Sequence, residues 1–405
     1  MTTVSSRPAP TSAPPLKQIG PFAWLQKHLF NTWYNSLLTV VIAAVMCAIA
    51  WGAATWVFTV AQWAVVPNNL ALFMSGLYPA EQYWRIWAML SVIVTMAGLS
   101  WGVLARNLTP LFSRNILIGL GIICGVAILW PLTRPSSPIL IGLLVWTCIM
   151  ALAGQWLGRQ YKGMGKWLSL GWFATYFINL WLLGGGLFLP SVRTSSWGGL
   201  TLTLLLAISG IALCFPIGVI LALGRRSTLP IVKGLSVAYI ELIRGVPLIS
   251  ILFMGQVMIP LFLPEGVRPD SIVRAITGLT IFSAAYLAEN VRAGLQAVPR
   301  GQFEAAASLG LNKPLTLALI VLPQALKTAI PAIVGQFISL FQDTTLLGIV
   351  GIVELLGISN SILANPTYLG RYAETYVFIA VIYWFFCYAM SLGSRRVEQA
   401  LNTGH

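Results

Sequence analysis

The segment 298–314 has the residue types and spacing of a short docking helix in a connecting loop. Pro299 and Gly301 interrupt the helix expected before them, and the run 302–309 is long enough for two helical turns. Gly310 stands where a residue in the left-handed conformation would end that helix. The sequence therefore predicts a short helix with a defined end.

One face of this predicted helix carries small side chains. Its members are Phe303, Ala306, Ala307 and Gly310. Their i, i+3, i+4, i+7 spacing places them on the same side of a helix. Such a face is suited to docking into a groove of another protein, and the alternative is an ordinary helix between two longer ones.

Two pairs of opposite charges have helical spacing. Glu241 and Arg244 form one pair, and Glu289 and Arg292 form the other. Residues three apart share a helix face, so each pair can form there. We expect a structural role for the first pair, which precedes a bend at Gly245. The second pair is either an interfacial ion pair or a gate or substrate contact.

A further polar group lies in an apolar neighbourhood, where Asp343 is followed by Thr344 and Thr345. A carboxylate in such surroundings is costly unless it is hydrogen-bonded. Asp343 therefore either caps a turn through the two threonines or lines a polar path. Gln256, within another apolar run, is open to both helix packing and substrate contact.

The sequence lacks the motifs that several kinds of chemistry require. The five cysteines lie in apolar runs without metal or redox spacing, and the two histidines are His28 and His405. No phosphate-binding G-x-x-x-x-G-K-[ST] motif occurs, since Gly163-Met164-Gly165-Lys166 lacks both its spacing and its hydroxyl. We therefore expect no catalytic residue, no metal and no bound cofactor in this chain.

The composition is that of a membrane protein. Of 405 residues, 58% are hydrophobic and only 8% are charged, against about 25% charged in soluble domains. Soluble enzymes and nucleic-acid-binding modules are thereby excluded. The net charge of +14 comes from basic residues between long apolar runs, as in the cytoplasmic loops of multi-span proteins.

Apolar windows of about 20 residues predict an all-α bundle of about ten membrane spans. The predicted spans are 36–60, 87–105, 115–131, 138–156, 167–189, 198–223, 246–263, 272–291, 317–340 and 374–392. Residues 1–35 precede them as a tail that we expect to be cytoplasmic and disordered. Within the third span, Gly121 and Gly125 form a G-x-x-x-G pair that favours close helix contact.

Basic residues are concentrated in alternate loops, so both termini are predicted to be cytoplasmic. The loops assigned to the cytoplasm carry Arg106, Arg114, Arg159, Lys162, Lys166, Arg225, Arg226, Lys233, Arg300, Lys313, Arg395 and Arg396. The opposite loops hold fewer, among them Arg85 and Arg134, together with Glu265 and Glu354. Prolines and carboxylates at membrane depth occur after residue 195. We therefore expect an accessory five-span bundle over 36–195 and a transport core over 196–400.

The docking-helix segment resembles the EAA loop of ABC-importer permeases. The matching residues are Glu304, Ala305, Ala306, Gly310, Leu322 and Pro323. The resemblance implies a type I permease core whose coupling helix sits in a groove of a cytoplasmic ATPase. It assigns to coupling Gln302, Glu304, Ala305, Ala306, Gly310, Leu322 and Pro323.

Other segments resemble the permeases of polar amino-acid importers. These segments are 197–204, 241–248, 285–294 and 340–346. Residues 76–79 and 84–85 resemble the long M-type permease of general L-amino-acid uptake systems. Gln342 departs from the family pattern, which has lysine at that position, so any charge pairing of that lysine is missing here.

The resemblance implies a bacterial inner-membrane protein with several partners. These are an ABC ATPase dimer that binds ATP and Mg, a periplasmic amino-acid-binding protein, and a second permease chain that we expect to be different but homologous. Membrane lipid surrounds the chain, and no nucleic acid is expected. The substrate-path candidates are Gln256, Glu289, Arg292, Asp343, Thr344 and Thr345. The alternative is a stand-alone secondary transporter or channel, which would often show internal repeats and intramembrane ion sites.

Overall fold

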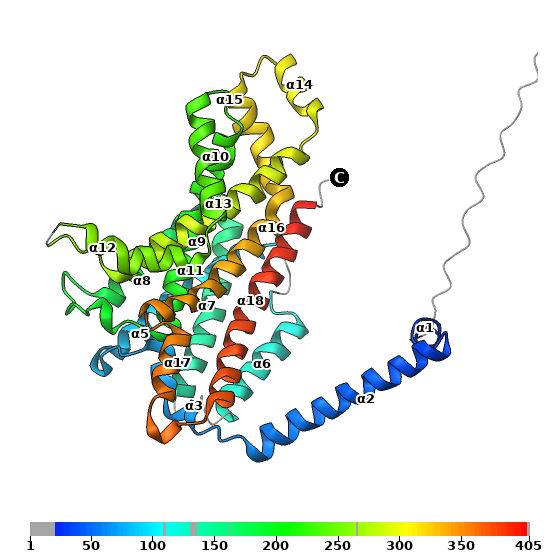
Figure 1. Cartoon of the computed structure of the whole chain (residues 1–405), viewed down its shortest axis with the longest axis vertical. Coiled ribbons are helices and arrows are strands. Elements are labelled where there is room, and N and C mark those ends of the chain that lie inside the picture. Colours follow the sequence, from blue (N-terminus) through cyan, green and yellow to red (C-terminus); the bar gives the residue numbers. More distant parts are fainter. Residues whose placement is uncertain (1–20, 108–110, 130–135, 162, 265, 403–405) are drawn as a thin grey trace, which may run out of the picture. The chain divides into compact units, whose positions relative to one another are not determined.

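The computed structural model describes residues 21–107, 111–129, 136–161, 163–264 and 266–402. Within these ranges the chain is built from helices, and the β-type pairings are two isolated bridges. The backbone forms two compact units, 1–62 and 63–405 (Figure 1). The predicted positions Lys162, Arg134, Glu265 and His405 lie outside the described residues, as do residues 1–20 of the predicted tail.

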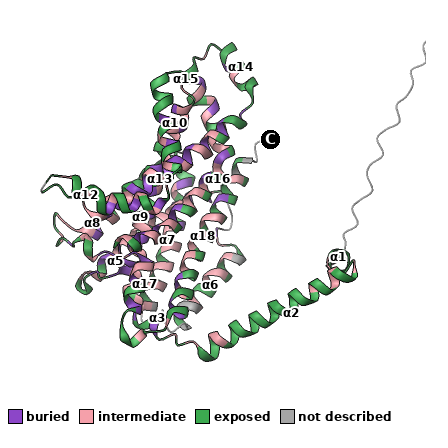
Figure 2. Cartoon of the chain, viewed as in Figure 1, coloured by how far each residue is buried: buried purple, intermediate pink, exposed green. Residues whose placement is uncertain are grey.

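The first unit is dominated by one long apolar helix. It contains α1 (Pro21–His28), α2 (Trp33–Thr55) and the π-helical turn η1 (Trp56–Val60). The 28 residues from Trp33 to Val60 extend about 42 Å at 1.5 Å per residue, and none of the apolar window is buried (Figure 2). A helix that is apolar all round suits a lipid environment. Within the predicted tail, Pro21–His28 is helical.

The second unit begins with the helices that precede the expected transport core. They are α3 (Val65–Asn68), α4 (Leu70–Ser75), η2 (Ala80–Gln82), α5 (Tyr83–Leu104), α6 (Arg114–Leu129), α7 (Ser137–Gln160), α8 (Met164–Gly184) and η4 (Thr194–Ser196). The expected boundary between 195 and 196 lies inside this compact unit.

Glycines bring α5 and α7 into backbone contact. A Cβ atom on Gly102 would lie 2.0 Å from the Ala151 carbonyl oxygen, and one on Gly154 would lie 2.4 Å from that of Leu99. Only glycine permits this approach. By contrast, a Cβ on Gly121 or Gly125 would meet nothing within 4 Å, so the predicted G-x-x-x-G contact is wrong.

The remaining helices form the C-terminal part of the second unit. They are α9 (Gly199–Arg225), α10 (Pro230–Arg244), α11 (Leu248–Phe253), η5 (Met254–Met258), α12 (Ile259–Phe262), α13 (Ser271–Ala297), α14 (Arg300–Ser308), α15 (Lys313–Thr316), η6 (Leu317–Val321), α16 (Leu322–Asp343), η7 (Thr344–Val350), α17 (Leu355–Leu363), η8 (Pro366–Tyr368) and α18 (Tyr372–Asn402). Figure 1 shows α10, α14 and α15 at one end of this unit and α3 and α17 at the other.

The predicted all-α membrane bundle is confirmed, and its described residues contain somewhat fewer candidate spans than the ten predicted. Among the described residues, seven helices are long and apolar enough to cross a membrane, or eight if the pair α10 and α11–α12, bent by 103°, counts as one span. Predicted spans 115–131 and 167–189 do not meet this test. Helix α6 has only 16 residues, and α8 has 21 but includes Asn179 and several Trp and Tyr side chains.

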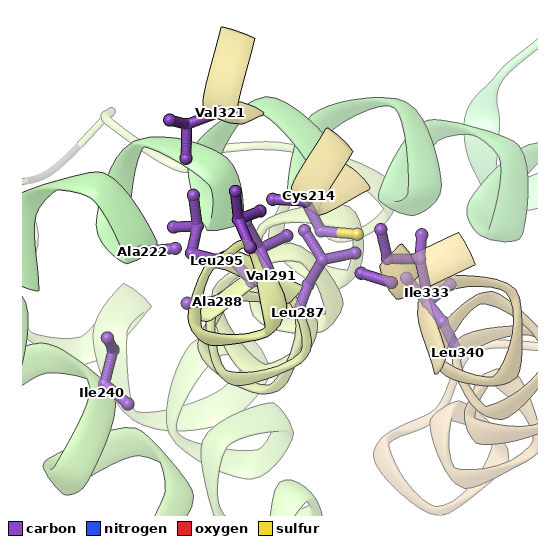
Figure 3. Close-up of a cluster of buried hydrophobic side chains, with 14 of the residues drawn as sticks. Cys214, Ala222, Ile240, Leu287, Ala288, Val291, Leu295, Val321, Ile333 and Leu340 are labelled. Atoms are coloured by element: carbon purple, nitrogen blue, oxygen red, sulfur yellow. The ribbon is translucent and has the colours of Figure 1, made fainter. Parts of the chain in front are cut away.

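The main core lies between α9, α13 and α16. Figure 3 shows its apolar side chains, including Cys214, Leu287, Val291 and Ile333. Small residues let these helices approach closely, since a Cβ on Gly294 would lie 2.3 Å from the Ala325 carbonyl oxygen. This close packing holds α13 rigidly next to α9 and α16, directly before the segment that contains α14.

Candidate functional site

The docking helix predicted from the sequence exists as α14, and it ends as expected. Gly310 has φ +77°, the left-handed conformation. Its N–H donates to the Ala307 carbonyl at 3.0 Å, and the Leu311 N–H donates to that of Ala306 at 3.1 Å. These two bonds form a Schellman motif, which fixes the end of α14 and the direction of the chain after it.

The face of α14 that is free differs from the one predicted. Ala306 is buried, and Phe303 packs against the core of α9, α13 and α16, so these two predicted docking residues contact their own chain. The other side of the helix is exposed. We define its free face by Glu304, Ala305, Ser308 and Leu309, of which Leu309 is 79% exposed. Ala307 and Gly310 of the predicted face are also exposed.

The two halves of the predicted coupling segment meet at the start of α16. The Gln324 amide donates to the Gln302 side-chain oxygen at 3.1 Å, which ties α14 to the first turn of α16. Leu322 begins α16 and Pro323 lies in its first turn, at the point where the helix changes from the π-helical turn η6 to α-helix. The π-helical turn η6 precedes them and joins α15 to α16.

A cluster of five charged side chains lies at the same end of the molecule. The Glu289 carboxylate accepts from Arg225 Nη1 at 2.7 Å and from Arg292 Nε at 2.9 Å, so the predicted Glu289–Arg292 pair is confirmed. Arg244 Nη1 lies 3.8 Å from the same carboxylate. Glu241 pairs with Arg225 at 2.9 Å, across two helices, rather than with Arg244 on its own helix.

Glu289 is therefore engaged by its own chain. Its side chain is only 15% exposed, and three guanidinium groups surround it. The sequence offered no signal for the contact with Arg225, because residues 64 positions apart meet only through packing of α9 on α13. Of the two readings of Glu289 and Arg292, the ion pair fits this geometry.

Within the described part of the chain, Asp343 has no such partners. It is half-buried at the junction of α16 and η7, and its side chain makes no cap hydrogen bond. The neighbouring threonines bond to their own turn, Thr344 Oγ1 to the Phe341 carbonyl at 2.7 Å and Thr345 Oγ1 to that of Gln342 at 2.8 Å. Asp343 therefore does not cap the turn through the threonines, and its carboxylate is available to bind another group.

Gln256 is used for helix packing. It lies in the π-helical turn η5 and is buried, and its amide donates to the Ser271 carbonyl at 2.6 Å. Arg274 in turn donates to the Gln256 backbone carbonyl. The side chain thereby fastens η5 to the first turn of α13.

The opposite end of the unit contains a buried carboxylate that the sequence analysis placed only as a loop residue. Glu354 is fully buried and caps α17, accepting from the N–H groups of Leu356 at 2.8 Å and Gly357 at 2.7 Å. Tyr383 donates to it at 3.4 Å. Burial raises the pKa of Glu354 to about 7, although these hydrogen bonds act in the other direction. An acid directly before the run 355–363 is a helix-start signal that could have revealed this role.

The N-terminal helices of the second unit reach this same end. A Cβ on Gly76 would lie 2.4 Å from the Cα of Gly198, and Thr201 Oγ1 donates to the Met74 carbonyl at 2.8 Å. Arg85, predicted as a loop residue, is fully buried and donates to the Pro190 carbonyl at 2.9 Å. Residues 74–85 thus hold the first turn of α9 in place.

Two apolar hollows mark the surface of the second unit. One, of about 390 Å³, lies between α9, α16 and α18 and is lined by Phe215, Ile333, Phe337 and Met390 among others. The other, of about 490 Å³, lies between α9 and α10. Their linings are almost wholly apolar, so neither supplies the polar groups that a charged or zwitterionic solute requires.

Known proteins are similar to this sequence over nearly its whole length. Residues 214–403 match the family described as "Binding-protein-dependent transport system inner membrane component". The inner membrane amino-acid ABC transporter permease protein YhdY of Escherichia coli is 39% identical over 398 residues, which cover 94% of this chain and 93% of that relative. The glutamate/glutamine/aspartate/asparagine transport system permease protein BztC of Rhodobacter capsulatus is 35% identical over 443 residues, with 99% and 97% covered.

Proposed function

Because this chain belongs to the family of binding-protein-dependent permeases of ABC importers, we propose that it imports amino acids, driven by a separate ATPase that docks on α14. The chain is a permease subunit and a multi-pass inner-membrane protein. Both full-length relatives are named for amino-acid transport, which supports that substrate class. Since they are permeases of transport systems, the reading as a stand-alone secondary transporter or channel is set aside.

The observation that carries the coupling role is the free face of α14. A short helix that presents an exposed leucine between small side chains is an apolar knob that a groove can bury. The rest of α14 is held firmly, because Phe303 and Ala306 pack on the core and Gln302 is tied to α16. A displacement of α14 by an ATPase bound at Leu309 would therefore be passed directly to the membrane helices.

Asp343 supports a substrate role at membrane depth. A zwitterionic amino acid needs an anionic partner for its ammonium group, and among the residues that the structure describes the Asp343 carboxylate makes no capping hydrogen bond and no ion pair. The other candidates are engaged elsewhere, since Glu289 binds arginines and Gln256 binds α13. Asp343 is thus the acid of this chain that a passing amino acid would meet, with Thr344 and Thr345 beside it as weaker candidates.

The remaining partners follow from the same reading. ATP and Mg are bound by the ATPase dimer, because this sequence lacks a phosphate-binding loop. A periplasmic binding protein delivers the amino acid, and a second, homologous permease chain completes the path. The basic residues Arg225, Arg226 and Arg300 lie at the α14 end, which supports its placement in the cytoplasm together with both termini.

The docking of α14 can be tested by co-purification of the ATPase from membranes that carry Leu309→Asp. Placing a charge where the partner groove is apolar should remove most of the ATPase while leaving the amount of inserted permease unchanged. Leu369→Asp is the matched control, because Leu369 is also an exposed leucine, at 68%, in the loop before α18. Full retention of the ATPase by Leu309→Asp would contradict the docking role.

A further inference from the structure

The cluster of Arg225, Glu241, Arg244, Glu289 and Arg292 joins three helices that are separate in the chain. Arg225 is the last residue of α9, Glu241 and Arg244 lie in the last turn of α10, and Glu289 and Arg292 belong to α13. Glu289 is the common member, since its two carboxylate oxygens contact an arginine from each helix. We call this set the three-helix clamp.

The clamp lies on the route from α14 into the membrane. Glu289 is about two turns before the end of α13, which is followed by Pro299 and then α14. Between the clamp and α14, Arg226 Nη1 donates to the Leu295 carbonyl at 3.0 Å, a second link from α9 to the last turns of α13. Displacement of α14 therefore reaches α13 at a point where α9 and α10 are attached to it.

The clamp joins two closely packed helices, α9 and α13, to a third, α10, that is packed less closely. Helices α9 and α13 share an apolar core in which a Cβ on Gly218 would lie 2.4 Å from Leu287. Helix α10 has less cover, because Ile231, Leu235 and Leu242 are exposed along one side. Its links to α13 include the contact of Arg244 with Glu289, the Arg244 guanidinium over the Tyr286 ring at 5.4 Å, and the bond from Tyr239 Oη to the Ile281 carbonyl at 2.8 Å.

The contacts of Glu289 with arginines leave its carboxylate little capacity to bind an amino acid as well. It is mostly buried, it is saturated by Arg225 and Arg292, and the cluster contains three cations against two anions. Removing the Glu289 charge would leave three arginines facing one another with only Glu241 to compensate, and like charges at such distances repel. Loss of the carboxylate would therefore weaken the attachment of α10 to α9 and α13, which already pack together through their apolar core.

We propose that Glu289 is a positioning residue, which binds the inner ends of α9, α10 and α13 into one body so that a movement of α14 is passed to all three. This proposal rests on the coupling role of α14. It assigns to Glu289 a part in transmitting motion rather than in contacting the amino acid.

The test is the number of amino acids imported per ATP hydrolysed, measured on the complete complex in liposomes. Glu289→Gln keeps the shape of the side chain and removes its charge. We expect uptake to fall about tenfold or more while ATP hydrolysis stays within about twofold, because α14 still docks but its movement is no longer shared. Glu289→Asp keeps the charge and should restore a substantial part of the ratio.

Glu81→Gln is the matched control, because Glu81 is an exposed acid of η2 that lies outside the clamp, so its loss leaves the contacts of Glu289 intact. Its ratio should stay within about twofold of the wild type. Two results would overturn the proposal: an unchanged ratio in Glu289→Gln, or a changed half-saturating amino-acid concentration at an unchanged ratio, which would make Glu289 a substrate contact. If α14 does not dock on the ATPase, a different experiment shows it: the Leu309→Asp permease would then retain the full amount of ATPase on co-purification.

Discussion

Replacing Glu354 by glutamine should remove a pH dependence of stability that this one carboxyl group creates. The side chain is fully buried at the start of α17, and burial raises its pKa to about 7. The hydrogen bonds from Leu356, Gly357 and Tyr383 favour the charged form but do not offset the burial. In the unfolded chain the same group has a pKa near its ordinary value, about 4.3.

The sign of the effect follows from these two values. Between about pH 4.3 and pH 7 the folded state binds more protons than the unfolded state, so the free energy of unfolding falls as the pH rises. The stabilisation is complete below the lower value and is lost as the pH passes the upper one. The whole difference between these two values corresponds to about 4 kcal/mol, of which about 3 kcal/mol is lost between pH 5 and pH 8. At about 2 °C per kcal/mol for a large domain, the unfolding midpoint would change by about 6 °C.

The assay is thermal unfolding of the detergent-solubilised protein at pH 5 and pH 8. Other groups also titrate in this interval. The informative comparison is therefore between two shifts in unfolding midpoint from pH 5 to pH 8, that of the wild type and that of Glu354→Gln. We expect the wild-type midpoint to fall by several degrees more. Glu81→Gln, which alters an exposed acid of η2, should behave like the wild type. An equal pH dependence in the wild type and Glu354→Gln would refute the reasoning.

Three further predictions concern packing, substrate and orientation. Gly102→Leu should destabilise the protein by about 2 kcal/mol or more, because its Cβ would collide with the backbone of α7, whereas Gly121→Leu should be neutral; equal midpoints in thermal unfolding would contradict this. Asp343→Asn keeps the shape and should lower amino-acid uptake at least several-fold with ATPase binding intact; wild-type uptake would place the substrate contact elsewhere. A cysteine at Gln302 should not react with an impermeant reagent added outside intact cells, and efficient labelling there would reverse the proposed orientation.

The features that depend on local sequence could be predicted well. The end of α14 at Gly310 follows from one residue that tolerates positive φ, and the Glu289–Arg292 pair follows from spacing on a single helix. The long apolar runs that form α9, α13, α16 and α18 were recognisable from composition. Short-range rules suffice for such features because the interacting groups are close in the chain.

Features that depend on packing between distant segments could not be predicted in this way. Helical periodicity placed Phe303 and Ala306 on one face of α14, but it could not show that this face packs against the chain's own core. The same limit applies to the contact of Arg225 with Glu289, which joins residues of different helices. Hydropathy also predicted more spans than the seven or eight found among the described residues, where α6 has 16 residues and a span needs about 20.

The central claim is that this permease moves amino acids only when an ATPase acts on α14. Its most direct test is uptake of a radiolabelled amino acid into liposomes that contain the permease, its partner permease chain and the ATPase, with the binding protein added outside and ATP enclosed. We predict uptake that requires ATP inside and is abolished by Leu309→Asp but not by Leu369→Asp. Uptake at the same rate without ATP, or by the permease alone, would contradict the claim.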